Sequence, residues 1–121
     1  MKDVFARHKK AIDILMIVYI MAAMDKVYKS LAEINRRKIV FWLSLGEMSV
    51  GEIVKKMNIS QATVSSHLAL LKKSGLVESR ILGKKRIYKL NSEKAKAFVR
   101  EINRLMSLEN QIGSDEIIIR R

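Results

Sequence analysis

The fold is decided by residues 60–76, which read Ser-Gln-Ala-Thr-Val-Ser-Ser-His-Leu-Ala-Leu-Leu-Lys-Lys-Ser-Gly-Leu. Ser60 is of a residue type that caps helix N-termini, and Gly75 behind two lysines is typical of a helix end. One face of the predicted helix is apolar at the i, i+4 and i+7 positions Val64, Leu68 and Leu71. The other face carries short polar side chains, so the helix packs on a core and exposes a polar surface.

A shorter helix precedes this one after a very tight turn. Ser49 and Glu52 stand three residues apart and form the signature of a capping box, and Asn58 ends the helix. Two helices joined so closely predict a helix-turn-helix unit. Further helices are predicted upstream, at 25–31 and 35–45.

The periodicity changes after Gly75. Residues 76–82 and 86–90 predict two strands, and Gly83, Lys84 and Lys85 supply the turn between them. Helix, tight turn, helix and basic hairpin follow one another in the order of a winged helix-turn-helix. We therefore expect a mainly α-helical protein with one small β-hairpin as its wing.

The polar surface of helix 60–74 predicts contact with DNA. Such a helix fits the major groove, where short polar groups can meet base edges and phosphates. Gln61 is the first candidate for base readout because its amide both donates and accepts hydrogen bonds. For any single one of these side chains, an ordinary exposed helix surface is the alternative. The candidates are Ser60, Gln61, Thr63, Ser65, Ser66 and His67.

Positive charge is concentrated in one quarter of the chain. The sequence has 24 Lys and Arg against 12 Asp and Glu, a formal net charge of +12. Ten basic and two acidic residues lie between Lys72 and Arg100, so this segment carries eight of the twelve net charges. A surface tuned only for solubility would mix both signs, whereas focused charge predicts a polyanionic partner. We expect the wing (residues 80–89) and the end of the helix to contact the DNA backbone or minor groove through Lys72, Arg80, Lys84, Lys85 and Arg86.

The N-terminal segment 1–23 has a basic head, and eleven uninterrupted apolar residues run from Ile14 to Met24. This run is shorter than the roughly 20 residues that span a membrane, so we expect no membrane-spanning helix. A helix apolar on most of its circumference must be buried, and a second subunit is the expected cover. A signal peptide, a partner or membrane contact and a dispensable extension are the alternatives. The predicted dimer residues are Ile14, Ile17, Val18 and Met21.

A long helix is predicted from about residue 93 to residue 111, with Ser92 as its cap. Its apolar residues recur near the 3.5-residue spacing of a helix-pairing seam, which favours a dimerisation helix over ordinary core packing. The predicted organisation is an added apolar helix at 1–23, a DNA-binding domain with its dimer helix at 24–112, and a tail at 113–121. The dimer residues predicted on the long helix are Phe98, Ile102 and Leu105.

The chain has no cysteine and only two histidines, His8 and His67. Disulfides and thiolate metal sites are therefore excluded, and the composition suits a reducing cytoplasm. The sequence shows neither a glycine-rich phosphate loop nor a nucleophile paired with a base, so we expect no enzymatic activity and no cofactor. A metal site needs three or four ligands, which a lone His67 does not supply.

The motif Ser-Gln-x-x-Val-Ser-x-His-Leu at 60–68, followed by Gly-Leu-Val at 75–77, resembles the ArsR family of bacterial and archaeal repressors. The resemblance covers about residues 25–90. It implies a homodimeric repressor that binds an operator and often controls its own operon. It also implies that Ser60, Gln61, Ser65 and His67 belong to the recognition helix.

Two departures separate the chain from the metal-sensing members of that family. Ser49 and Gly51 stand where those members carry Cys-x-Cys, and helix 93–111 has none of the histidines of the other familiar sensor site. Ile34 also replaces the usual Pro near the start of one helix. The resemblance thus implies a metal-independent repressor, whose inducer, if it has one, is an unidentified small molecule or partner protein.

The alternative function is a protein-interaction or dimerisation module that keeps the winged-helix shape without reading DNA. Such a module does not need focused charge, so replacing Lys84, Lys85 and Arg86 by Ala would leave it active. RNA reading is disfavoured because the predicted strands carry no series of stacking aromatic residues between their basic residues. The predicted assembly is a homodimer on a double-stranded DNA operator.

Overall fold

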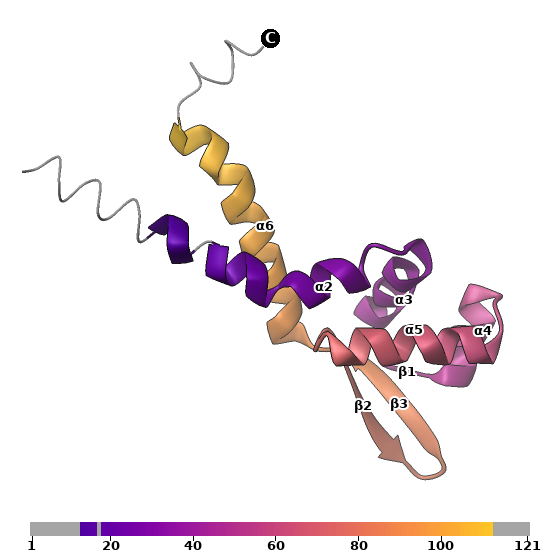
Figure 1. Cartoon of the computed structure of the whole chain (residues 1–121). Coiled ribbons are helices and arrows are strands. Elements are labelled where there is room, and N and C mark those ends of the chain that lie inside the picture. Colours follow the sequence, from indigo (N-terminus) through magenta and orange to yellow (C-terminus); the bar gives the residue numbers. More distant parts are fainter. Residues whose placement is uncertain (1–12, 17, 113–121) are drawn as a thin grey trace, which may run out of the picture.

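The computed structural model describes residues 13–16 and 18–112 and is mainly helical, with a small antiparallel sheet (Figure 1). Residues 13–16 and 18–23 are helical, and a turn at Met24 separates them from the next helix. The predicted winged helix-turn-helix is confirmed. The elements that follow are α2 (Asp25–Ser30), α3 (Ile34–Leu45), β1 (Met48–Ser49), α4 (Val50–Met57), α5 (Gln61–Lys73), β2 (Val77–Leu82), β3 (Lys85–Leu90) and α6 (Ser92–Ile112).

One hydrophobic core lies among α2, α3, α4, α5 and the base of β2. The three apolar residues predicted on the inner face of α5 are completely buried, as their helical spacing requires. They pack with the buried residues of the neighbouring elements, so α5 is fixed on one face and free on the other. The core consists of Val27, Ile39, Leu43, Ile53, Val64, Leu68, Leu71, Leu76 and Val77.

Side-chain caps fix where the helices begin. Glu33 caps α3 by accepting a hydrogen bond from the backbone N–H of Arg36 at 3.1 Å, so Ile34 starts this helix without the usual Pro. Ser49 and Glu52 form the predicted capping box of α4, and Ser60 caps α5. Between these two helices Asn58 adopts the left-handed conformation (φ 55°), which Asn tolerates better than most residues.

The sheet has three strands in the order β1-β3-β2, one more than the predicted hairpin. The additional strand β1 consists of two residues, and Met48 pairs with Tyr88. The turn is also shorter than predicted, because Lys85 pairs with Leu82 and leaves only Gly83 and Lys84 outside the ladder. Gly83 takes a positive φ of 63° at the turn, which favours glycine.

The prediction that Ser92 caps the last helix is wrong. The side-chain oxygen of Asn91 accepts the hydrogen bond from the backbone N–H of Lys94 at 3.1 Å, and Ser92 is already part of α6. Asn is as good a cap as Ser, so residue type alone could not separate the two positions. Figure 1 shows α6 and the N-terminal helix extending away from the β2–β3 hairpin.

Candidate DNA interface

The first turns of α5 present the predicted polar surface. Five of the six polar candidates on or next to this helix are exposed: Ser60, Gln61, Thr63, Ser65 and Ser66. Ser60 and Thr63 also serve the helix start, because the Ser60 hydroxyl accepts a hydrogen bond from the Thr63 backbone N–H and lies 2.8 Å from the Thr63 hydroxyl. Gln61, Ser65 and Ser66 project from a helix whose opposite face is buried in the core.

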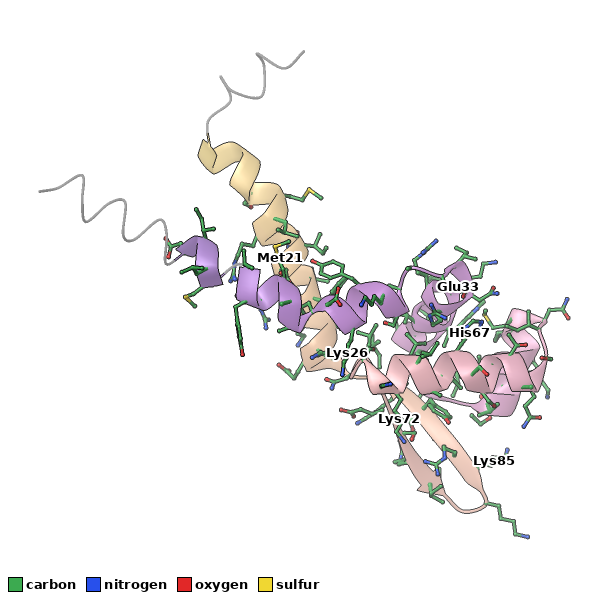
Figure 2. All side chains as sticks on the ribbon, in the orientation of Figure 1. Met21, Lys26, Glu33, His67, Lys72 and Lys85 are labelled. Atoms are coloured by element: carbon green, nitrogen blue, oxygen red, sulfur yellow. The ribbon has the colours of Figure 1, made fainter. Side chains whose placement is uncertain are left out.

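His67, the sixth candidate, points back into the protein. Its side chain is only 13% exposed, and its Nε2 lies 3.7 Å from a carboxylate oxygen of Glu33 (Figure 2). Its Nδ1 lies 3.3 Å from the guanidinium of Arg36, which can only donate, so Nδ1 is the acceptor. The structure thus places His67 against the start of α3, apart from the exposed polar candidates.

Glu33 is the anchor of this inward-facing group. Partial burial acts to raise the pKa of Glu33, but hydrogen bonds from the backbone N–H groups of Asn35 and Arg36 and the charge of the Arg36 guanidinium outweigh it. The net result is a pKa below the ordinary value of 4.5. Glu33 therefore stays ionised at neutral pH and joins the α2–α3 connection to the middle of α5.

Two of the basic candidates converge between the end of α5 and the wing. Lys72 Nζ donates to the hydroxyl of Ser79 at 2.8 Å, and Arg86 Nη1 donates to the same oxygen at 3.1 Å. Residues paired across the ladder share a face, so Ser79 and Arg86 both lie on the side of the hairpin that faces α5. The sequence could not indicate Ser79 as the residue that holds these two cations together.

Arg80 lies on the other face of the hairpin and is engaged within the protein. Its guanidinium makes two hydrogen bonds to the carboxylate of Glu47, at 2.6 and 2.8 Å. The hydrogen bond from Arg80 lowers the pKa of Glu47, and the same contact raises the pKa of Arg80. Arg80 therefore ties the wing to the segment before β1, and the structure does not bring it together with the cations that face α5.

A hollow of about 360 Å³ links the helix-turn-helix to the wing. Gln61 from α5 lines it together with the exposed wing residues Lys85 and Arg86. Lys55 on α4 also lines it, and sequence reasoning missed this residue although it lies in the last turn before Asn58. Side chains predicted separately for base and backbone contact thus border one concave surface, whose lining consists of Ser49, Val50, Gly51, Glu52, Lys55, Gln61, Lys85 and Arg86.

The residues predicted to form the dimer fall into two groups. Ile14, Val18 and Met21 are exposed on the N-terminal helix, whereas Ile17 lies outside the described residues. Phe98, Ile102 and Leu105 on α6 are half-buried, and Phe98 also packs against the protomer's own core and meets Tyr28 edge to face, with ring centroids 5.1 Å apart. Sequence reasoning missed Val99 and Met106, two exposed apolar residues of α6 separated by seven positions.

Two further findings concern metals and membranes. Within residues 13–16 and 18–112, no three His, Asp or Glu side chains are grouped so that they could hold a metal ion. In the same part of the chain, every helix is too short or too polar to cross a membrane.

Comparison with known proteins agrees with this architecture. The profile of the arsR family of bacterial regulatory proteins matches residues 35–79, which cover α3 to the start of β2. The chain is 36% identical over 83 residues to the transcriptional activator HlyU of Vibrio cholerae, a match that covers 69% of this chain and 77% of HlyU. The chain belongs to the ArsR family.

Other relatives include the transcriptional repressor SdpR of Bacillus subtilis, which is 35% identical over 57% of this chain and 77% of SdpR. Among solved structures, HlyU superposes with a TM-score of 0.60 at 34% identity, over 69% of this chain and 91% of that one. The homodimeric winged helix-turn-helix domain of Mb0332 from Mycobacterium bovis has a TM-score of 0.61 at 27% identity, over 77% of this chain and 88% of that one. This ArsR-family protein is therefore a DNA-binding transcriptional regulator and not an enzyme.

Proposed function

We propose that this ArsR-family protein is a homodimeric, metal-independent repressor that works in the cytoplasm. In this proposal helix 60–74 reads the major groove, and the 80–89 wing contacts the backbone or minor groove. The observation that carries the proposal is the hollow in which Gln61 lies beside Lys85 and Arg86. In this arrangement the amide of Gln61 can hydrogen-bond to base edges while the two neighbouring cations contact phosphates.

The structure refines the role that we propose for each candidate. We assign base contacts to Gln61, Ser65 and Ser66, which are exposed, and phosphate contacts to Ser60, Thr63, Lys72, Lys84, Lys85 and Arg86. For His67 and Arg80 we propose a positioning role, because Glu33 and Arg36 hold the first and Glu47 holds the second. His67 would hold α5 against the start of α3, and Arg80 would hold the wing against the segment before β1.

Two features of the single chain support the proposed homodimer. The N-terminal helix exposes Ile14, Val18 and Met21 to solvent in the single chain, an unfavourable state that a partner would relieve. Where α2 meets α6, the hydroxyl of Tyr28 and both carboxylate oxygens of Glu101 are buried without a hydrogen-bond partner among the described residues. Burial, with the charge of Glu101 as a smaller cause, raises the pKa of Tyr28 above its ordinary value of 10.0. Unpaired buried polar groups are costly, so we propose that this junction rearranges when a second subunit packs against it.

The proposal of metal independence rests on the donor set. The relatives include a cadmium resistance regulatory protein, the CadC homolog of Staphylococcus aureus, but this chain has no cysteine at all. Ser49 and Gly51 occupy the start of α4, where Ser49 is engaged in the capping box. The inducer in this proposal is a small molecule or a protein, if the regulator responds to any.

The division of labour along the chain follows the same proposal. Segment 1–23 supplies dimer packing, 24–112 is the DNA-binding domain with its dimer helix, and 113–121 is a tail.

The relatives named above include both an activator and a repressor, so the direction of regulation needs its own test. Deleting the gene should raise transcription from a promoter to which the protein binds, and a fall in transcription would contradict repression.

DNA binding itself is tested on a fragment upstream of the protein's own gene. The wild-type protein should bind one site tightly, with an affinity that falls roughly a thousandfold or more between 50 and 200 mM salt. Gln61→Ala should lose the preference for that site, while Asn103→Ala, an exposed change on α6, should keep it. Equal binding to all sequences by the wild-type protein would overturn the reading role of α5 and favour a module that does not read DNA.

A further inference from the structure

The outer face of α3 carries an apolar stripe that the core does not use. Ile34, Lys38, Phe41 and Leu45 follow one another at i, i+4, i+7 and i+11, so they line one side of the helix. Ile34, Phe41 and Leu45 are 51%, 56% and 66% exposed, although α3 already buries Ile39 and Leu43 on its inner side. We call these four residues the α3 stripe. Exposed apolar side chains gathered on one face of a helix in this way indicate an interaction site.

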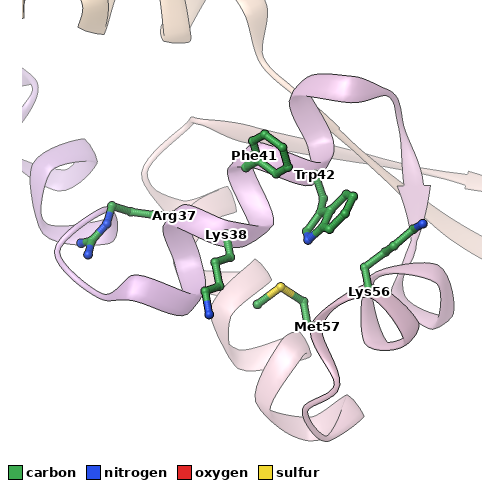
Figure 3. A pocket seen from close by; sticks show the side chains of 6 residues that line it. All are labelled: Arg37, Lys38, Phe41, Trp42, Lys56 and Met57. Atoms are coloured by element: carbon green, nitrogen blue, oxygen red, sulfur yellow. The ribbon is translucent and has the colours of Figure 1, made fainter.

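A pocket of about 440 Å³ opens beside the stripe, between α3 and the end of α4 (Figure 3). Phe41 and Trp42 meet edge to face in its wall, with ring centroids 5.3 Å apart, and Met57 adds an apolar surface. The ammonium of Lys56 lies 5.1 Å from the centre of the Trp42 ring, a cation–π distance. The rings are thus held in a defined arrangement at an open surface.

Every charged residue that lines this pocket is a cation. These residues are Arg37, Lys38 and Lys56, and none of them belongs to an ion pair within the part of the chain that the structure describes. Arg37 is fixed at the rim because its guanidinium donates to the carbonyl oxygen of Leu31 at 2.7 Å. The occupant that complements this surface has both apolar groups and negative charge.

The surface formed by the α3 stripe and its pocket is separate from the candidate DNA interface and from the proposed dimer surface. None of its residues is a DNA candidate on α5 or the wing, and none lies on the N-terminal helix or α6. In the dimer on DNA that we propose above, this surface would therefore stay accessible. Aromatic residues, Met and Arg are also the residue types enriched at protein interfaces, with Trp and Arg prominent among their energetic hot spots.

We infer that the α3 stripe and its pocket form a docking site for an acidic amphipathic helix of a partner protein. The stripe extends over three turns of α3, roughly 16 Å, which exceeds what a small ligand in the pocket would cover. Apolar side chains at one-turn intervals of the partner helix pack on Ile34, Phe41 and Leu45, and one of them enters the pocket beside Trp42. Its carboxylates pair with Arg37, Lys38 and Lys56.

Trp42 is the only tryptophan of the chain, so its fluorescence reports on this site directly. The probe is an acetylated and amidated peptide of about 15 residues, near the lower limit for helix formation in water, with Leu on one face and Glu on the flanks. Added to the full-length protein, it should change Trp42 emission saturably. The same peptide with Gln in place of Glu should bind about tenfold more weakly, because it cannot pair with three cations.

Two charge-reversed double variants separate docking from general attraction to a basic protein. Lys38→Glu/Lys56→Glu should abolish the response, whereas Lys26→Glu/Lys73→Glu, which lowers the net charge equally on other elements, should retain it. Phe41→Ala should also weaken binding. If circular dichroism shows that Lys38→Glu/Lys56→Glu is unfolded, Lys38→Gln/Lys56→Gln takes its place. No emission change with the acidic peptide, equal binding of both peptides, or an equal loss in the control double variant would each overturn the inference.

Discussion

Arg80 and Lys84 carry the same charge on the same hairpin, but their surroundings differ. Glu47 holds Arg80 through two short hydrogen bonds, whereas no ion pair within the described ranges includes Lys84, which is exposed in the turn. A cation that is already neutralised by a carboxylate displaces few counterions from DNA. In the proposed complex, the local partner, more than the charge itself, therefore decides which wing residue is free to contact a phosphate.

This difference gives a prediction about salt dependence. Lys84→Ala should reduce the slope of log affinity against log salt by about 0.9 for each protomer, because one phosphate contact is lost. Arg80→Ala/Glu47→Ala removes a neutral pair and should leave the slope unchanged. Fluorescence anisotropy with a labelled operator fragment at several salt concentrations measures both. A smaller slope in the double variant would mean that Arg80 leaves Glu47 to contact DNA.

A second residue-scale prediction concerns the capping box of α4. Hydrogen bonds from the backbone N–H and the hydroxyl of Ser49 lower the pKa of Glu52 below 4.5. A pKa that is lowered by folding gives stability that is present above the unfolded value and is lost as the pH falls through the folded one. Wild type should therefore be more stable than Glu52→Gln at neutral pH, and the two should converge as the pH falls below about 4.5. Denaturant titrations at pH 7 and at successively lower pH measure this gap, and a gap that widens in acid would contradict it.

At the scale of elements, sequence reasoning predicted well the helices whose periodicity and caps agree. The inner face of α5, the capping box of α4 and the hairpin are all local patterns, so they could be predicted. Strand β1 has only two residues and exists because β3 pairs with it, which no local pattern encodes. The inward turn of His67 and the Arg80–Glu47 pair depend on contacts 31 to 34 residues away in the sequence, on Arg36, Glu33 and Glu47. The sequence thus predicted a set of candidate interface residues, but it could not predict which of them are engaged within the protein.

The exposed apolar face of the N-terminal helix gives a prediction about dimerisation. Val18 is 55% exposed in the single chain, so Val18→Glu should leave the protomer folded but place a charge in the proposed dimer contact. Leu45→Glu on α3 is the matched control, because Leu45 is 66% exposed and lies on another surface. Sedimentation velocity should show monomers for Val18→Glu and dimers for Leu45→Glu. Dimers in both variants would show that this helix does not form the contact.

At the scale of the whole molecule, the proposed DNA surface and the proposed dimer surface point in different directions. The wing and α5 lie on one side, and Figure 1 shows the N-terminal helix and α6 leaving the molecule away from the hairpin. A dimer formed through these two helices would hold two α5 helices at a fixed separation, as in other helix-turn-helix dimers. The spacing of the two half-sites in DNA then becomes a property of the protein rather than of the sequence being read.

That rigidity can be tested once footprinting has defined the two half-sites. Inserting about five base pairs between them turns one half-site to the opposite side of the duplex and should reduce the affinity to that of a single half-site. Inserting about ten base pairs returns both half-sites to the same side of the duplex but leaves them farther apart than in the natural site. Both insertions should therefore weaken binding, the shorter one at least as much as the longer. Val18→Glu should bind all three fragments alike, because a monomer has no spacing to satisfy. If wild type tolerated both insertions, the two reading heads would be joined flexibly, and the proposed packing of the N-terminal helix and α6 would have to be abandoned.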